Sequence, residues 1–166
     1  MLTAMTEAEH RAIENDVLYY RNRWNYHAAA IRAVEEQRPQ TLLEIGPSLF
    51  PLFHGCDTMD IWGTPTYMHD ARIVPWPCAS KAYDVVLALQ VWEHLGPEQA
   101  RAFTEVTRVA KSAVLSFPYH WTSCGPGDEH YMITDETITQ WTLGLKPTKR
   151  LLVRDTEERL ILRFQF

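Results

Sequence analysis

Carboxylates and a glycine stand where two apolar segments of the chain end. Residues 41–46, TLLEIG, form a short apolar run that contains Glu44 and closes with Gly46, and a second strand is expected around Asp57 to Trp62, with Asp60 near its end. A glycine lets the backbone pass close to a ligand that a Cβ atom would push away. A carboxylate after a second strand can accept both hydroxyl protons of a ribose. The pattern indicates a ribose-binding site, against the alternative that Asp60 only caps a turn.

Histidines later in the chain could carry proton transfer. His94 precedes a helix that begins with a proline, and His120 and His130 lie in a loop at 119–133. An imidazole can deprotonate a hydroxyl at neutral pH, although His94 could simply bond the exposed backbone at the start of the helix. With the neighbouring acids, His120 and His130 could also bind a metal, but no compact spacing such as H-E-x-x-H is present. We therefore expect contact with an acceptor and no metal site.

Three familiar motifs are missing from the sequence. A dinucleotide site needs G-x-G-x-x-G, so that a helix N-terminus meets the pyrophosphate, and after Gly46 the second and third glycines are absent. Neither the G-x-S-x-G of hydrolases nor a P-loop lysine occurs. The sequence therefore disfavours a nicotinamide cofactor, a hydrolase of that class and a P-loop enzyme.

The elements that must position these residues begin with a helical stripe. Between Thr6 and about residue 38, apolar residues recur every three or four positions, and Thr6 with Glu9 forms a capping box. The stripe predicts one helix, or two with a bend near Asn25, that ends before Pro39. Its members are Ile13, Val17, Tyr20, Trp24, Ala28, Ile31 and Val34.

Strand patterns dominate the rest of the chain. Besides the segments named above, residues 83–89 and 112–118 read as buried strands, and a helix from Gly96 to Ala110 is expected to connect them as a parallel crossover. Thr134 is expected to cap a short helix, and residues 149–166 to form a hairpin. We therefore predict an α/β fold: a three-layer sandwich with a mostly parallel, doubly wound sheet and a C-terminal antiparallel hairpin. One domain is expected over 1–166, with an N-terminal helical segment at 1–38 and a Rossmann-like core at 41–166.

Composition narrows the functional class. The chain has 166 residues, 46% hydrophobic and 22% charged, which is enough to build a core without metal or disulfide support. The net charge of −5 argues against nucleic acid as the main partner. No apolar run approaches the roughly 20 residues of a membrane helix, and no signal peptide is evident, so a cytoplasmic location is expected. Three widely spaced cysteines suggest no disulfide framework.

The order of motifs resembles that of the class I S-adenosylmethionine-dependent methyltransferases. The matching segments follow one another from residue 41 to residue 95, and the crossover at 97–118 and the hairpin at 149–166 fit the later part of that family. The nearest resemblance is to a short form found among small-molecule and glycan-pathway methyltransferases, with LEIGPS in place of the glycine-rich loop. The matching segments are LEIGPS, the acid at Asp60, His69-Asp70-Ala71, Pro75-Trp76-Pro77, YDVVLAL and Gln90-Val91-Trp92-Glu93-His94-Leu95.

The resemblance implies roles for individual residues. Glu44 and Gly46 would lie by the methionine part of S-adenosyl-L-methionine, Asp60 would bind the ribose, and Asp70 with Ala71 would flank the adenine. Gln90 and Trp92 would line the pocket near the transferable methyl group, with Glu93 and His94 at its edge. The N-terminal helical segment would fold over the cofactor as a lid, or else simply pack on the sheet. Pro47, Ser48, Ile61 and Tyr20 complete the expected cofactor-binding set, and His120 and His94 are the candidate bases.

The function implied by the resemblance is methyl transfer. S-adenosyl-L-methionine would donate its methyl group in line to an oxygen or nitrogen of a small-molecule or glycan-type acceptor, leaving S-adenosyl-L-homocysteine, and a homodimer is one candidate assembly. The competing hypothesis is a noncatalytic binding or assembly module with the methyltransferase fold, suggested by the reduced loop at Gly46 and the six tryptophans. Titration with the cofactor separates the two.

Overall fold

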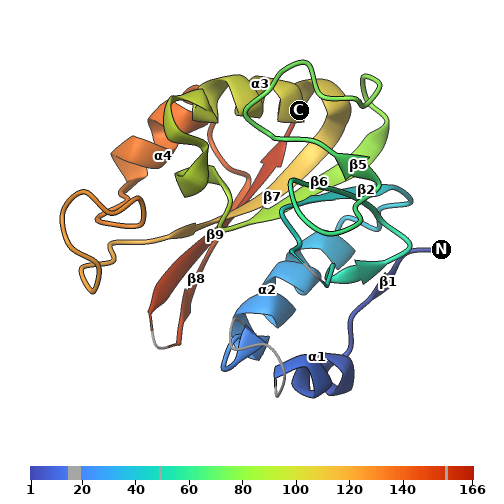
Figure 1. Ribbon diagram of the computed structural model, residues 1–166, viewed down its shortest axis with the longest axis horizontal. Coiled ribbons are helices and arrows are strands. Elements are labelled where there is room, and N and C mark those ends of the chain that lie inside the picture. Colours follow the sequence, from blue (N-terminus) through green and yellow to red (C-terminus); the bar gives the residue numbers. More distant parts are fainter. Residues whose placement is uncertain (15–19, 49, 156) are drawn as a thin grey trace.

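A seven-stranded sheet forms the middle of the molecule (Figure 1). The computed structural model describes residues 1–14, 20–48, 50–155 and 157–166. The strand order is β5-β4-β2-β6-β7-β9-β8, in which the first five strands run parallel and β9 and β8 are antiparallel additions. The strands are β2 (Leu42–Ile45), β4 (Asp57–Asp60), β5 (Tyr67–Met68), β6 (Tyr83–Leu89), β7 (Ala110–Pro118), β8 (Lys149–Arg154) and β9 (Glu158–Gln165).

Helices cover both faces of this sheet, which gives three layers. The helix α2 (Trp24–Glu35) packs on one face, and α3 (Gln99–Val109) and α4 (Asp135–Trp141) pack on the other (Figure 1). Strand β6 serves both layers because successive side chains of a strand point to opposite faces. Val85 and Leu87 join the α2 side, whereas Val86 and Ala88 join the α3 side. The predicted fold class is therefore confirmed.

The described part of the N-terminal stripe contains two helices. Thr6 and Glu9 make the expected capping box at the start of α1 (Glu7–Glu14): the Glu9 amide donates to Thr6 Oγ1, and the Thr6 amide donates to Glu9 Oε2 over 2.7 Å. The bend comes just before α2, where the Arg23 amide donates to the carbonyl of Tyr20. Val17, a member of the stripe, lies outside the described residues. The buried face of α2 is wider than the stripe, because it also contains Tyr26, His27, Ala29, Ala30 and Ala33.

The crossover helix starts later and ends earlier than its sequence pattern suggests. A short 3-10 segment, η2 (Trp92–Glu98), contains the Gly-Pro pair and turns at Gly96, whose φ is +57°. Helix α3 then ends at Val109, and Ala110 begins β7, so the expected placement of Ala110 in the helix is wrong. The reason is the sheet: Ala110 pairs with Tyr83 of β6, and this tertiary pairing outweighs a local helical preference.

The remaining elements agree with the pattern, and three short strands go beyond it. Thr134 caps α4 by accepting a hydrogen bond from the Thr137 amide, and β8 and β9 form the C-terminal hairpin. β5 and the two-stranded sheet of β1 (Thr3–Ala4) and β3 (Phe53–His54) were not predicted. The division into segments 1–38 and 41–166, and the lid role of the first, stay predictions. Within the described ranges, no helix has both the length and the apolar character needed to cross a bilayer.

A buried histidine pair holds the two N-terminal helices together. His10 of α1 and His27 of α2 share a hydrogen bond of 2.8 Å between Nε2 and Nδ1, and both side chains are buried. Burial, together with the neighbouring His10, Arg23 and Arg159, lowers the pKa of His27 to about 3. The folded state therefore keeps His27 neutral at a pH where the unfolded chain binds a proton.

We expect His27 to make folding acid-sensitive. Because its folded pKa lies below its unfolded value of 6.5, the stability it confers is present above pH 6.5 and declines as pH falls toward 3. Relative to a His27→Gln variant, wild type should lose about 2 kcal/mol of unfolding free energy between pH 7 and pH 5. Urea unfolding at both pH values measures the difference, and the exposed His54→Gln variant serves as control. A constant difference between wild type and His27→Gln would refute the assignment.

Candidate functional site

A cavity of about 390 Å³ opens at the carboxyl ends of β2, β4 and β6. β4 lies on one side of β2 and β6 on the other, so the strand order reverses here, and this is the place where open α/β sheets bind ligands. The volume falls within the roughly 300–1,000 Å³ usual for small-molecule sites. Residues after each of these strands line the cavity: Gly46 and Ser48 after β2, Asp60 and Ile61 at the end of β4, and Gln90 and His94 after β6.

Gly46 is required by both conformation and space. Its φ is +66°, and its amide donates to the carbonyl of Met59 over 2.9 Å, which ties the end of β2 to β4. A Cβ atom at this position would lie 2.7 Å from Cγ2 of Val91, another residue of the cavity wall. The glycine therefore lets the turn after β2 and the turn after β6 approach each other across the floor of the cavity.

Asp60 is held rigidly at the tip of β4. Its Oδ1 accepts hydrogen bonds from the amides of Ile61 and Trp62, and its Oδ2 accepts one from the Ser48 amide over 3.0 Å. The carboxylate thus joins the loops after β2 and β4. Each carboxylate oxygen has more than one acceptor position, so Asp60 can still receive a ligand hydroxyl.

Asp70 and Ala71 also line the cavity. The Asp70 carboxylate pairs with the Arg72 guanidinium, with 2.6 Å between Oδ2 and Nη2, and this pairing lowers the pKa of Asp70. Ala71 is buried, and its carbonyl accepts a hydrogen bond from the indole of Trp76. The wall therefore combines a fixed ion pair with a small apolar side chain.

Gln90 projects a polar group at the end of β6. It has a φ of +53°, and its Oε1 accepts hydrogen bonds from Arg23 over 2.9 Å and Arg159 over 3.4 Å. Its Nε2 is buried and has no hydrogen-bond partner among the described residues. Buried amide groups are normally paired, which makes this nitrogen unusual, and Gln90 as a residue lines the cavity.

Comparison with known proteins points to one fold. Residues 59–115 match the family described as "Methyltransferase domain". The N-methyltransferase NodS from Bradyrhizobium japonicum WM9, solved with S-adenosyl-L-homocysteine, superimposes with a TM-score of 0.64 at 17% identity, covering 85% of each chain. The chain has the class I methyltransferase fold.

Further solved structures agree. The PH0226 protein from Pyrococcus horikoshii OT3 gives a TM-score of 0.65 at 14% identity, covering 88% of this chain and 90% of that one. Magnesium protoporphyrin IX methyltransferase from Synechocystis PCC 6803 gives 0.58 at 14% identity, covering 86% and 84%. No curated protein matches the sequence. The predicted resemblance to class I methyltransferases is thus confirmed.

Several residues predicted for the site lie outside the cavity of this methyltransferase fold. Trp92 is only 1% exposed and donates from its indole to the carbonyl of Gln99, which places it in the core beneath α3. Tyr20 is buried and donates to the carbonyl of Phe50. His120 is exposed and stacks on Tyr119. Pro47 lies beside the lining residues Gly46 and Ser48 without lining the cavity itself.

The cavity wall also contains residues outside the predicted cofactor-binding set. Trp62 lines the rim while 73% exposed, and His69, Arg72 and Leu95 also contribute. His69 and Arg72 flank the Asp70-Ala71 pair that the motif identified, so their position next to this pair in the sequence could have indicated that they line the cavity. Trp62 follows Asp60 by two residues, and a tryptophan this exposed is suited to contact a ligand.

Glu44 lies behind the cavity rather than in it. It is fully surrounded by protein, and its Oε2 accepts a hydrogen bond from the Leu52 amide over 2.8 Å. Burial raises the pKa of Glu44 to about 8, even though hydrogen bonds from the backbone of Leu52 and Phe53 favour the charged form. Its observed contacts fasten the 52–53 segment to β2.

The stability of the Glu44→Gln variant relative to wild type should increase as pH rises. The folded pKa of Glu44 lies above its unfolded value of 4.5, so its contribution is present below pH 4.5 and is lost as pH rises toward 8. The unfolding free energy of the variant minus that of wild type should increase by about 3 kcal/mol between pH 4.5 and pH 7. Chemical denaturation across this range measures it, with exposed Glu35→Gln as the matched control. A pH-independent difference would show that Glu44 is ionised in the fold.

Proposed function

We propose that the protein binds S-adenosyl-L-methionine in this cavity and transfers its methyl group to an oxygen or nitrogen of a small-molecule or glycan-type acceptor. The observation that carries the proposal is the cavity at the strand reversal, lined in chain order by Gly46, Asp60, Asp70 with Ala71, and Gln90. These are the positions at which the family's motifs fall in this sequence. NodS and the magnesium protoporphyrin IX methyltransferase were both solved with S-adenosyl-L-homocysteine.

The residues present suit each part of this cofactor. Gly46 leaves the turn after β2 free of a side chain, and Asp60 offers a carboxylate to the ribose hydroxyls. Gln90 supplies a polar residue to the same cavity wall. Ala71, Ile61 and Leu95 supply apolar wall for a planar base. The cofactor would supply an electrophilic methyl group on a sulfonium.

Catalysis then rests on positioning. Methyl transfer is an in-line displacement in which the acceptor atom bonds to the methyl carbon as the carbon–sulfur bond breaks and its electron pair stays on sulfur. A fixed site accelerates such a step by holding the two atoms close and collinear and by excluding water. Gln90, anchored by two arginines, and the rigid Asp60 provide that fixation.

An acceptor hydroxyl would also need to lose its proton. His94 borders the cavity and pairs through Nδ1 with Glu129 over 2.5 Å. This contact fixes the orientation of the imidazole and leaves Nε2 as the nitrogen that can accept a proton. Of the two histidines expected to act as base, His94 lines the cavity and His120 does not, which supports His94 for this role.

We expect S-adenosyl-L-homocysteine to stabilise the protein, by about 2.7 kcal/mol at a hundredfold excess over its Kd. Asp60→Asn should weaken binding about 10- to 100-fold, because the amide retains one oxygen for the Ile61 and Trp62 amides but replaces one carboxylate acceptor. Calorimetry measures both affinities, and Glu136→Gln, an exposed acid on α4, is the matched control. Unchanged affinity in a folded Asp60→Asn variant would reject the ribose role. No response of wild type to the cofactor or its product would favour the noncatalytic module.

A further inference from the structure

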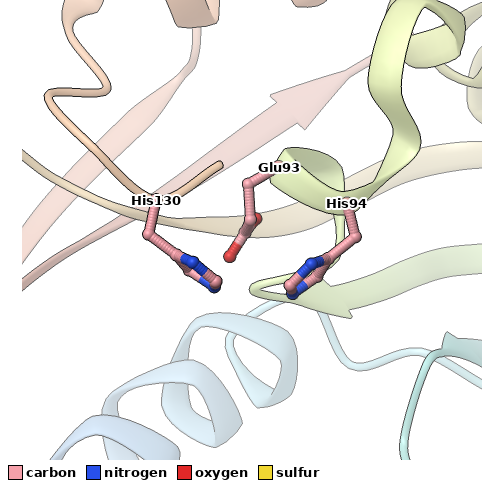
Figure 2. Close-up of side chains that lie close together, drawn as sticks. All are labelled: Glu93, His94 and His130. Atoms are coloured by element: carbon pink, nitrogen blue, oxygen red, sulfur yellow. The ribbon is translucent and has the colours of Figure 1, made fainter. Parts of the chain in front are cut away.

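Three potential metal ligands meet at the edge of the cavity. Glu93 and His94 come from η2, and His130 comes from the loop after β7. Figure 2 shows the two imidazoles facing each other with the Glu93 carboxylate between them. One ligand atom from each residue lies within 4.8 Å of the others. Because a bound ion sits about 2 Å from nitrogen and oxygen ligands, atoms grouped this closely can share one ion.

Glu93 supplies an independent reason to expect a cation. Its side chain is buried, with 3% of the residue exposed, and neither carboxylate oxygen has a hydrogen-bond partner among the described residues. A buried carboxylate without partners is strongly unfavourable, and such groups in folded proteins are normally paired or bound to metal. Glu44, the other deeply buried acid described above, has backbone donors, whereas Glu93 points toward two histidines.

Each of the two histidines has a carboxylate partner on one ring nitrogen, a contact that is common for metal-binding histidines. Nδ1 of His94 pairs with Glu129 over 2.5 Å, and Nδ1 of His130 pairs with Asp128 over 2.8 Å. A carboxylate on one ring nitrogen fixes the tautomer and raises the basicity of the other nitrogen, as it does for most metal-binding histidines. Each imidazole is thereby left with Nε2 as the atom available to an ion.

The loop that carries His130 is fixed in place. The Met132 amide donates to the carbonyl of Trp121 over 2.9 Å, and the His120 amide donates to that of Ile133 over 3.0 Å. The indole of Trp121 stacks on the His130 ring, with centroids 5.8 Å apart and planes 14° from parallel. These contacts hold His130 opposite His94, so the three ligands are positioned before any ion binds.

We propose that Glu93, His94 and His130 bind one divalent first-row transition-metal ion. Two imidazole nitrogens and one carboxylate oxygen suit manganese, iron, cobalt or zinc better than magnesium or calcium, which prefer oxygen ligands. This differs from the sequence expectation of no metal, which rested on spacing along the chain. Three protein ligands leave coordination positions open, and His94 lines the cavity, so an acceptor oxygen can reach the ion.

The site also bears on the proposed methyl transfer, and this part rests on that function. A hydroxyl bound to such an ion becomes a stronger acid, so its proton can pass to water before the oxygen attacks the methyl carbon. His94 would then act as ligand and not as base. Metal binding itself requires neither the cofactor nor the acceptor.

Titration of chelator-treated protein with Co²⁺ and Mn²⁺ tests the proposal. We expect one ion per chain by calorimetry, with Co²⁺ giving visible absorption bands from histidine coordination. His130→Ala and Glu93→Gln should each weaken binding at least about tenfold, whereas His54→Ala, which removes an exposed histidine elsewhere, should not. Absence of saturable one-to-one binding, or equal affinity in wild type and His130→Ala, would overturn the site.

Two further measurements keep the result clear. Thermal unfolding verifies that each variant is folded. If the Glu93→Gln variant does not fold, the His130→Ala variant still tests the proposal, because His130 is a partly exposed residue of a loop. Affinity for S-adenosyl-L-homocysteine in His130→Ala should match that of wild type, since His130 does not line the cavity. Lost metal binding with intact product binding supports the assignment, while metal binding without any product binding refutes only the proposed methyl transfer.

Discussion

The whole arrangement depends on β6 being buried on both faces. Val85 and Leu87 pack under α2, and Val86 and Ala88 pack under α3, so the strand cannot slip by one residue without exchanging two cores. This fixed register determines where β6 ends. The chain then turns at Gln90, where φ is positive, and η2 follows this turn. Glu93 and His94 of η2 therefore lie near the end of β6. A cavity wall and the positions of Glu93 and His94 therefore follow from the packing of one strand.

The sequence reveals this part of the fold because it concerns long apolar segments. Strand β6 coincides with the predicted 83–89, and β2 and β7 fall within a few residues of their predicted positions. β1, β3 and β5 are two-residue strands whose existence depends on a partner, such as β4 for β5. Nothing local distinguishes such segments from loop, so they cannot be predicted from pattern alone.

The residues predicted at the ends of β2, β4 and β6 line the cavity, whereas Glu44 and Trp92, each two residues from such a position, do not. Gly46, Asp60 and Gln90 terminate strands, and the end of a parallel strand is where the fold leaves space. Glu44 belongs to the strand itself, two residues beyond Leu42, which packs on the α2 side. Alternation sends the Glu44 side chain toward that same side and to the Leu52 amide. Trp92 follows Gln90 by two residues, but the turn of η2 directs it into the core.

Glu44 and Glu93 show why burial alone does not identify a site. Burial raises the pKa of both carboxyls to about 8, yet Glu44 accepts hydrogen bonds from backbone amides, whereas the side-chain oxygens of Glu93 have no hydrogen-bond partner among the described residues. The burial of Glu44 is explained by its hydrogen bonds to the 52–53 segment. Glu93 faces His94, its neighbour in sequence, and His130, which only the return of the chain after β7 brings near. A motif search along the chain cannot detect a ligand set assembled from two loops, because the spacing that matters is set by the sheet. His94 lines the cavity and pairs with Glu129 of the loop after β7, so these two residues connect that loop to the cavity.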